Sequence, residues 1–234
     1  MRFGSAAPLA LFAAISLLPG AAHAQSARDL LTKAAFQDRS RTTALQRIET
    51  VRAGTLAALQ RNKDDQDAAV LAAIALGYHA KLTGERSQAL AARREFEQVV
   101  GRFPRNAEAQ AGLGAWHLGI ISHAGRFVAR AAAGARESVG LAALDKSVAL
   151  GGRRAMFLGL AGLMRINLDP EDSRGVGLLE AASKAPTPTA LDRIIQRSAV
   201  AVLGPLRRGD RKGAKALADQ LLPFGWYDKK RSAS

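Results

Sequence analysis

The feature that most constrains this sequence is that almost everything beyond residue 25 consists of helix-forming blocks. The blocks are rich in Ala, Leu, Arg, Gln and Glu, all of which favour the α-helix. Gly, Pro and Asp separate the blocks at short intervals. Only 5% of the residues are aromatic, which disfavours a β-sandwich or a β-barrel. We therefore expect an all-α fold, built as an array of antiparallel helix hairpins.

Several helix boundaries have a physical cause. Pro104 stops the helix before it, because the residue preceding a proline avoids the α region, and Asn106 then caps the next helix. The segment 123–136 either extends the helix before it or forms an inserted helix. The expected helices are 27–37, 41–61, 66–82, 86–102, 106–122, 137–150, 153–166, 173–184, 189–206 and 210–222.

The first 24 residues have the pattern of a cleavable export signal. Arg2 precedes a short apolar run from Ala6 to Leu18, and Ala22-His23-Ala24 places small residues at the two positions that a signal peptidase reads. We expect cleavage after Ala24 and a periplasmic or secreted protein. The chain has no cysteine, so neither a disulfide framework nor a lipid-modified cysteine is available to it.

The stretch 68–104 contains a recurring pattern of small and large residues. Leu76-Gly77 is followed by a turn at Gly84-Glu85 and then by Ala92, Phe96, Val99 and Pro104. This spacing resembles a tetratricopeptide repeat, in which a small residue lets two helices approach and a large one fills the adjacent gap. Leu113-Gly114 and Leu158-Gly159 look like further copies of the first-helix signature. The departures from the family are about three extra residues between Gly84 and the Phe96/Pro104 set, an insertion around 123–136 and a missing early tryptophan.

The resemblance implies a right-handed solenoid over residues 68–222. It is preceded by N-terminal helices in 25–67 and followed by a cap and basic tail in 223–234. We expect Phe96 to be buried and Ala92 to lie at a close helix contact. The glycines at 112, 114, 119, 159 and 162 should let the helices pack closely. The aromatic segment 223–227 is expected to cap the last helix pair, the alternative being an interfacial anchor beside the basic tail.

No residue pattern indicates a reaction, a metal site or a cofactor. A nucleophile elbow, a P-loop and an H-E-x-x-H helix are all absent from the sequence. His117 and His123 lie six residues apart, so they do not share one face of a helix. The acidic pairs Asp64-Asp65 and Glu171-Asp172 fall at expected helix starts, where carboxylates favour the positive end of the helix dipole.

The charge is strongly positive, with 34 Lys and Arg against 20 Asp and Glu. A net charge of +14 favours acidic partners, including anionic lipids, cell-wall polymers and acidic proteins. The export signal and the scarcity of aromatic residues argue against nucleic acid.

The function we expect is a non-enzymatic scaffold that binds a protein or peptide in the cell envelope. The tetratricopeptide resemblance implies a concave groove lined by the first helices, with Tyr78, Lys81, Glu108 and Arg153 as candidate binding residues. Two alternatives remain at this point: a binding module for an anionic polymer or membrane surface, and a helical cell-wall hydrolase, which would need a carboxylate in an apolar cleft.

Overall fold

The computed structural model describes residues 19–227, and all regular secondary structure in that range is α-helical. The all-α prediction is confirmed, and the observed helices begin and end close to the expected residues. They are α1 (Pro19–Phe36), α2 (Arg41–Arg61), α3 (Gln66–Thr83), α4 (Arg86–Arg102), α5 (Ala107–Ala124), α6 (Arg126–Ala133), α7 (Glu137–Leu150), α8 (Ala155–Leu168), α9 (Ser173–Ser183), α10 (Ala190–Arg207) and α11 (Arg211–Leu221).

One of the two alternatives for segment 123–136 is confirmed, and α1 differs from the expectation. The uncertain segment 123–136 contains a separate short helix, α6, between two glycines with positive φ, Gly125 and Gly134. Helix α1 begins earlier than expected and runs through the junction between Ala24 and Gln25, where we expect cleavage. The apolar run of the export signal lies outside the described residues.

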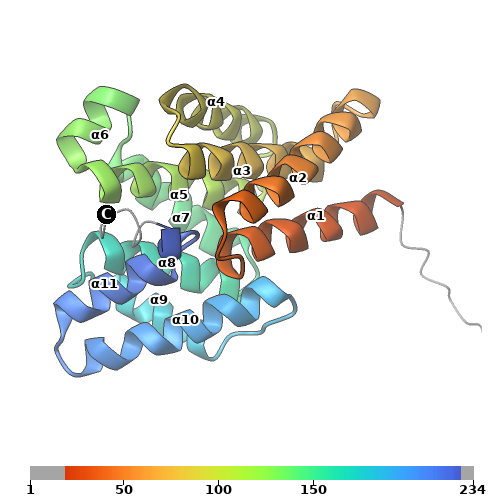
Figure 1. Ribbon diagram of the computed structural model, residues 1–234. Coiled ribbons are helices and arrows are strands. Elements are labelled where there is room, and N and C mark those ends of the chain that lie inside the picture. Colours follow the sequence, from red (N-terminus) through yellow and green to blue (C-terminus); the bar gives the residue numbers. More distant parts are fainter. Residues whose placement is uncertain (1–18, 228–234) are drawn as a thin grey trace, which may run out of the picture.

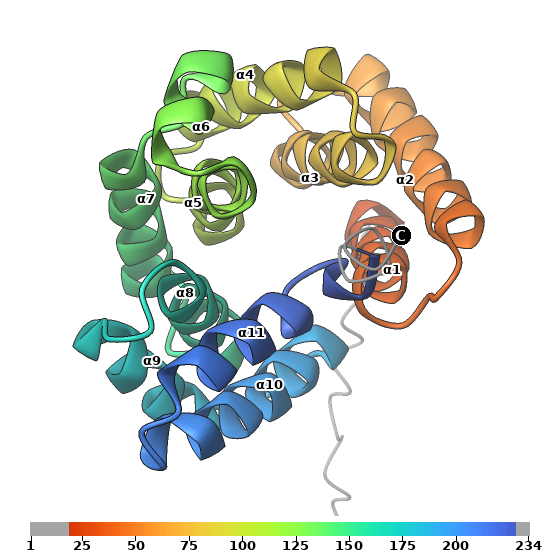
Figure 2. The same ribbon diagram turned by 60° about the vertical axis from the view of Figure 1, so that its left-hand side comes forward.

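The helices are arranged as hairpins around a ring (Figure 2). Helices α1, α3, α5 and α8 lie on the inside, and α2, α4, α7 and α9 lie on the outside. Helices α10 and α11 complete the ring between α8 and α1. The chain therefore passes alternately between an inner and an outer position, with α6 as an addition between α5 and α7 (Figure 1).

Short polar side chains start most of these helices. The side chains of Asp65, Asn106, Asp172 and Asp210 each accept a hydrogen bond from a backbone N–H in the first turn of the helix that follows. Thr189 forms a reciprocal capping box with Asp192 at the start of α10. These caps satisfy donors that would otherwise have no partner, and they explain why the hairpins begin where the sequence has isolated polar residues.

The inner helices cross their outer partners at glycines. A Cβ atom on Gly114 would lie 2.9 Å from the carbonyl oxygen of Gly140, and one on Gly162 would lie 3.1 Å from that of Gly175. On Gly77 it would lie 3.9 Å from the Cβ of Ala92. We call Gly77, Gly114 and Gly162 the crossing glycines, because each allows an inner helix to approach its own outer partner.

This geometry corrects the register expected for the third hairpin. The sequence suggests Leu158-Gly159 as the copy of Leu113-Gly114. Gly159 approaches Ile195 of α10 and also Ala182 of its partner helix α9, where a Cβ would lie 3.4 Å from that of Ala182. Gly162, by contrast, approaches the backbone of α9 at Gly175, as Gly114 approaches Gly140. The equivalent position therefore lies three residues later in the chain. The sequence alone offered two glycines on one helix and no means of telling which neighbour each one meets.

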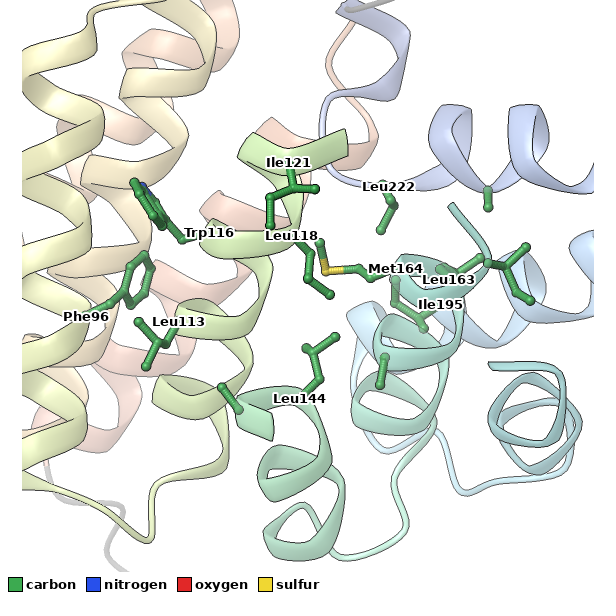
Figure 3. Packing of buried hydrophobic residues seen from close by; sticks show 14 of the residues in the cluster. Phe96, Leu113, Trp116, Leu118, Ile121, Leu144, Leu163, Met164, Ile195 and Leu222 are labelled. Carbon is green, nitrogen blue, oxygen red and sulfur yellow. The ribbon is translucent and has the colours of Figure 1, made fainter. Parts of the chain in front are cut away.

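A continuous apolar core joins the helices from α3 to α11 (Figure 3), and a second cluster packs α1 and α2 against α3 and Phe224. Phe96 is buried, as expected, and its ring lies against the backbone of Gly112 on α5 and beside Gly77 on α3. Ala92 is fully buried, which confirms the close contact expected there. Leu144 and Leu179 occupy the corresponding places on α7 and α9, and both are fully buried.

The last described segment packs against α1 and α3. The Phe224 ring is fully buried and stands edge-on to Tyr78 of α3, with 5.0 Å between ring centroids. The Phe224 backbone N–H donates to the carbonyl of Ala35 in α1 at 3.0 Å. The expectation that this segment caps the last helix pair is thus corrected. It packs on the first helices, because the ring brings them next to the end of α11.

Candidate functional site

Residues of the inner helices α1, α3, α5 and α8, together with the start of α10, line a small pocket. Its volume is about 80 Å³, room for a few water molecules or one short side chain. Three of its walls come from the same position in three hairpins, six residues before each crossing glycine: Leu71, Glu108 and Met156. Ile74 and Leu191 widen the apolar part of the lining. The pocket therefore lies where residues from the inner helices of three hairpins meet.

One side of the pocket is held by Arg28 of α1. Its guanidinium donates to both carboxylate oxygens of Glu108, at 2.9 to 3.1 Å, and to Asp67 at 2.6 Å. Arg28 is 27% exposed at its side chain and Glu108 is 18% exposed, so this pair is shielded from the full screening of water. These hydrogen bonds connect α1 with α3 and α5. Bidentate geometry of this kind fixes direction as well as distance.

The opposite side is held by Arg154, at the start of α8, and Asp192 of α10. The Asp192 carboxylate is fully buried and accepts from Arg154 at 2.8 Å and from the backbone N–H of Met156 at 2.9 Å. Burial alone would raise the pKa of Asp192. The hydrogen bonds from Arg154, Thr189 and Met156 outweigh burial and lower the pKa below its ordinary value. This carboxylate is therefore ionised at neutral pH and acts as an acceptor.

The structure brings two of the four candidate groove residues together. Tyr78 and Glu108 both line the pocket. Tyr78 is only partly exposed, because its ring packs against Phe224, and burial raises the pKa of its hydroxyl well above the ordinary value. Tyr78 is thus a wall of the pocket and not a projecting anchor on an open face.

The other two candidates lie elsewhere. Lys81 donates to the carbonyl of Pro223 at 2.9 Å, so it contributes to the closure between α3 and the C-terminal segment. Arg153 is exposed in the turn before α8, with a φ of 63°. Its assignment to the groove rested on Leu158 as the reference position. With Gly162 as the crossing glycine, the matching residue is Met156, which does line the pocket.

Sequence reasoning missed the charged partners of the pocket, Arg28 and Arg154 with Asp192. The spacing of Thr189 and Asp192 is a capping-box signal that could have placed Asp192 at a helix start. No local signal connects Arg28 with Glu108, because the two residues lie 80 positions apart and meet only when α1 packs beside α3 and α5.

A second hollow of about 310 Å³ lies between α9, α10 and α11. Its rim carries Glu171 and Glu180 on one side and Arg207 and Arg211 on the other. No set of equivalent hairpin positions meets there. Within residues 19–227, no group of three histidines and carboxylates is placed to hold a metal ion.

Comparison with protein-family models, with curated proteins and with solved structures finds no match. The pocket is thus described from this chain alone. Among the helices of the described part of the chain, none is long and apolar enough to cross a membrane.

Proposed function

We propose that the chain is a tetratricopeptide-like scaffold that binds an extended segment of a protein or peptide partner at its inner pocket. The single observation that carries this proposal is the convergence of Leu71, Glu108 and Met156, one from each hairpin, on one cavity. Repeat scaffolds bind along the face where equivalent positions of successive repeats line up. The small apolar floor suits one short side chain, and the charged rim suits the polar backbone beside it.

A binding role accounts for the ionisable groups better than a catalytic one does. A hydrolase would need a carboxyl group of raised pKa in a cleft. Asp192 has a lowered pKa because Arg154 and backbone N–H groups hold its charge. Burial raises the pKa of Glu95, with Arg52 opposing the effect, but Glu95 lines neither of the two cavities. We therefore propose no catalytic, metal or cofactor role for these residues.

The cell envelope is the location we propose, on the basis of the small-residue site at Ala22-His23-Ala24. Cleavage after Ala24 would start the mature chain at Gln25, which lines the pocket next to Arg28. The mass of the processed protein tests this directly. A mature N-terminus at Gln25 supports export, and a retained Met1 contradicts it.

The pocket is tested by selecting peptides from a displayed random library on the immobilised full chain. Ile74→Trp would fill the cavity, and Asp29→Lys would reverse a rim charge; both residues are only partly buried. We expect either change to weaken the selected peptides by at least roughly tenfold, the loss typical of a central contact. Asp64→Lys changes an acidic side chain that is 91% exposed and lies outside the pocket, so it should not affect binding.

Thermal unfolding of each variant completes the test. Lost binding with an unchanged melting temperature supports the proposal. Peptides that bind wild type and both pocket variants equally well would show that the partner surface lies elsewhere.

A further inference from the structure

The insertion between α5 and α7 presents an apolar surface to solvent. Helix α6 projects at the edge of the molecule (Figure 1), and Ala129 is its one buried residue in the described structure. Phe127 is 92% exposed and Val128 is 59% exposed. Ala131 and Ala132 are also exposed and lie one turn further along the same side of the helix. This arrangement is the reverse of an ordinary surface helix, whose apolar side faces the core.

The rest of the protein holds α6 firmly in this orientation. Arg93 of α4 donates to the carbonyl of Ala133 at 3.0 Å, and Arg86 donates to that of Ala132. At the other end, Arg126 pairs with Glu137 of α7. Gly134, in the left-handed conformation, closes the helix. A helix of eight residues without such contacts would be only marginally stable in water. These contacts therefore keep α6 helical, with Phe127 facing the solvent.

Positive charge surrounds the apolar face. Arg130 lies one turn from Phe127, is exposed, and makes no ion pair within residues 19–227. Arg86, Arg93 and Arg136 lie at the end of α6 or just beyond it. Two of the arginines around α6 form ion pairs, Arg126 with Glu137 and Arg93 with Glu97. The remaining charge around α6 is positive, like the net charge of +14 of the whole chain.

We propose that α6 docks the protein on the surface of an anionic phospholipid bilayer. Phe127 and Val128 enter the interface between headgroups and acyl chains, and Arg130 and Arg136 lie against the headgroups. A bilayer of this kind offers apolar depth and negative charge at the same place. A second copy of the chain fits less well, since one Phe, one Val and two Ala fall far short of the roughly 800 Å² per partner of a stable interface.

The direct test places a fluorophore at the docking point of the full chain. Phe127→Trp introduces an indole, and vesicles of equal parts phosphatidylglycerol and phosphatidylcholine carry brominated acyl chains that quench it on contact. The wild-type signal is subtracted to remove Trp116 and Trp226. We expect quenching in the anionic vesicles and little in pure phosphatidylcholine. Leu56→Trp, at a position 54% exposed on α2, is the matched control and should stay unquenched.

Paired substitutions test the same proposal through affinity. Phe127→Ser should weaken vesicle binding roughly tenfold, the effect of withdrawing one aromatic side chain from an apolar phase. Val128→Ser and Arg130→Gln should each weaken it by a smaller factor. Helix α10 carries a matched pair, because Val200 is 53% exposed and Arg197 is exposed one turn before it. Val200→Ser and Arg197→Gln should leave binding unchanged.

Three results would overturn the proposal. The chain could bind vesicles while the indole introduced at position 127 stays unquenched, which would assign binding to another segment. Arg130→Gln and Arg197→Gln could weaken binding equally while Phe127→Ser leaves it unchanged, which would reduce the interaction to net charge. Sedimentation could show a dimer that Phe127→Ser abolishes, which would assign the face to a second copy. Peptide binding at the inner pocket does not depend on α6, so the two proposals stand or fall separately.

Discussion

The hairpins α5/α7 and α8/α9 solve the same packing problem with different connections. In both, a crossing glycine on the inner helix meets a glycine on the outer helix, Gly114 with Gly140 and Gly162 with Gly175. In α8/α9 the connection is a short turn that ends in the helix cap Asp172. In α5/α7 the connection contains α6. A conserved geometry of packing thus tolerates a large change in the loop, because the crossing itself is set by the helices.

The two hairpins also differ in the side chain that lies three residues after the crossing glycine, and in the polar contacts that this side chain makes. Arg165 of α8 donates to the cap carboxylate of Asp172 at 2.9 Å and to Asp145 of α7 at 2.7 Å. His117 holds the same position on α5, three residues after the crossing glycine, and its Nδ1 accepts from the backbone N–H of Arg136 at 3.1 Å. The Nε2 of His117 is buried with no hydrogen-bond partner among the described residues. At this position the α8/α9 hairpin is stabilised by ion pairs of Arg165, and the α5/α7 hairpin by the hydrogen bond of a neutral imidazole.

The largest expected effect is a difference in acid sensitivity between the two hairpins. Burial, together with the nearby charges of Arg93 and Arg136 and against the effect of Glu97, lowers the pKa of His117 from 6.5 to about 4. A depressed pKa means that the unfolded chain binds the proton more readily, so the stabilisation is complete above pH 6.5 and is lost as the pH falls toward 4. The loss should be about 3 kcal/mol in the free energy of unfolding.

The α8/α9 hairpin should keep its stability to a lower pH than the α5/α7 hairpin. Burial alone would raise the pKa of Asp172, but the Gly175 N–H and Arg165 outweigh it and lower the pKa. Its contribution is lost only as the pH falls below the ordinary carboxyl value, about 4. Urea unfolding of wild type and His117→Asn at pH 7 and pH 4.5 measures the histidine share. At pH 5 the backbone amides of α5 and α7 should exchange their hydrogens faster than those of α8 and α9. Equal exchange in the two hairpins would refute the comparison.

The next effect is at the crossings themselves. Gly114→Ala should destabilise the protein by about 2–3 kcal/mol, because the added methyl meets the Gly140 carbonyl oxygen at 2.9 Å and Leu144 at 2.8 Å. Gly162→Ala should cost less, about 1–2 kcal/mol, since the carbonyl oxygen of Gly175 lies at 3.1 Å. Denaturant midpoints of the two variants provide the measurement. The opposite ranking would mean that the two crossings are not equivalent.

The smallest effect comes from the glycines that face open space on the same hairpins. Gly119 of α5 and Gly177 of α9 have no atom within 4 Å of where a Cβ would lie. Replacing either by alanine should raise the free energy of unfolding by about 0.5–1 kcal/mol, because glycine is the more costly residue in a helix interior. A loss of stability at Gly119 or Gly177 would show that the helix face is covered.

The sequence was a good guide wherever structure depends on near neighbours. Breaks at Pro104 and Gly84, together with the polar caps, are local signals, and the helices begin and end near them. Phe96 and Ala92 were predictable because they share a helix and a spacing. The role of Gly159 was not, since Gly159 contacts α10 as well as its partner helix α9, and no local pattern reveals the contact with α10. Arg28 with Glu108 and Tyr78 with Phe224 join residues distant in the chain, and no local pattern connects them.

The contact between Phe224 and α1 has a consequence for the order in which the protein folds. Most of its helices pack against their neighbours in the chain, and contacts of that kind form early because the loop to be closed is short. The hydrogen bond from Phe224 to Ala35 joins α1 to the segment that follows α11, so it closes a loop that contains nearly all of the described helices. The hairpins can therefore assemble as the chain is made, while the ring itself stays open until the segment after α11 has been synthesised.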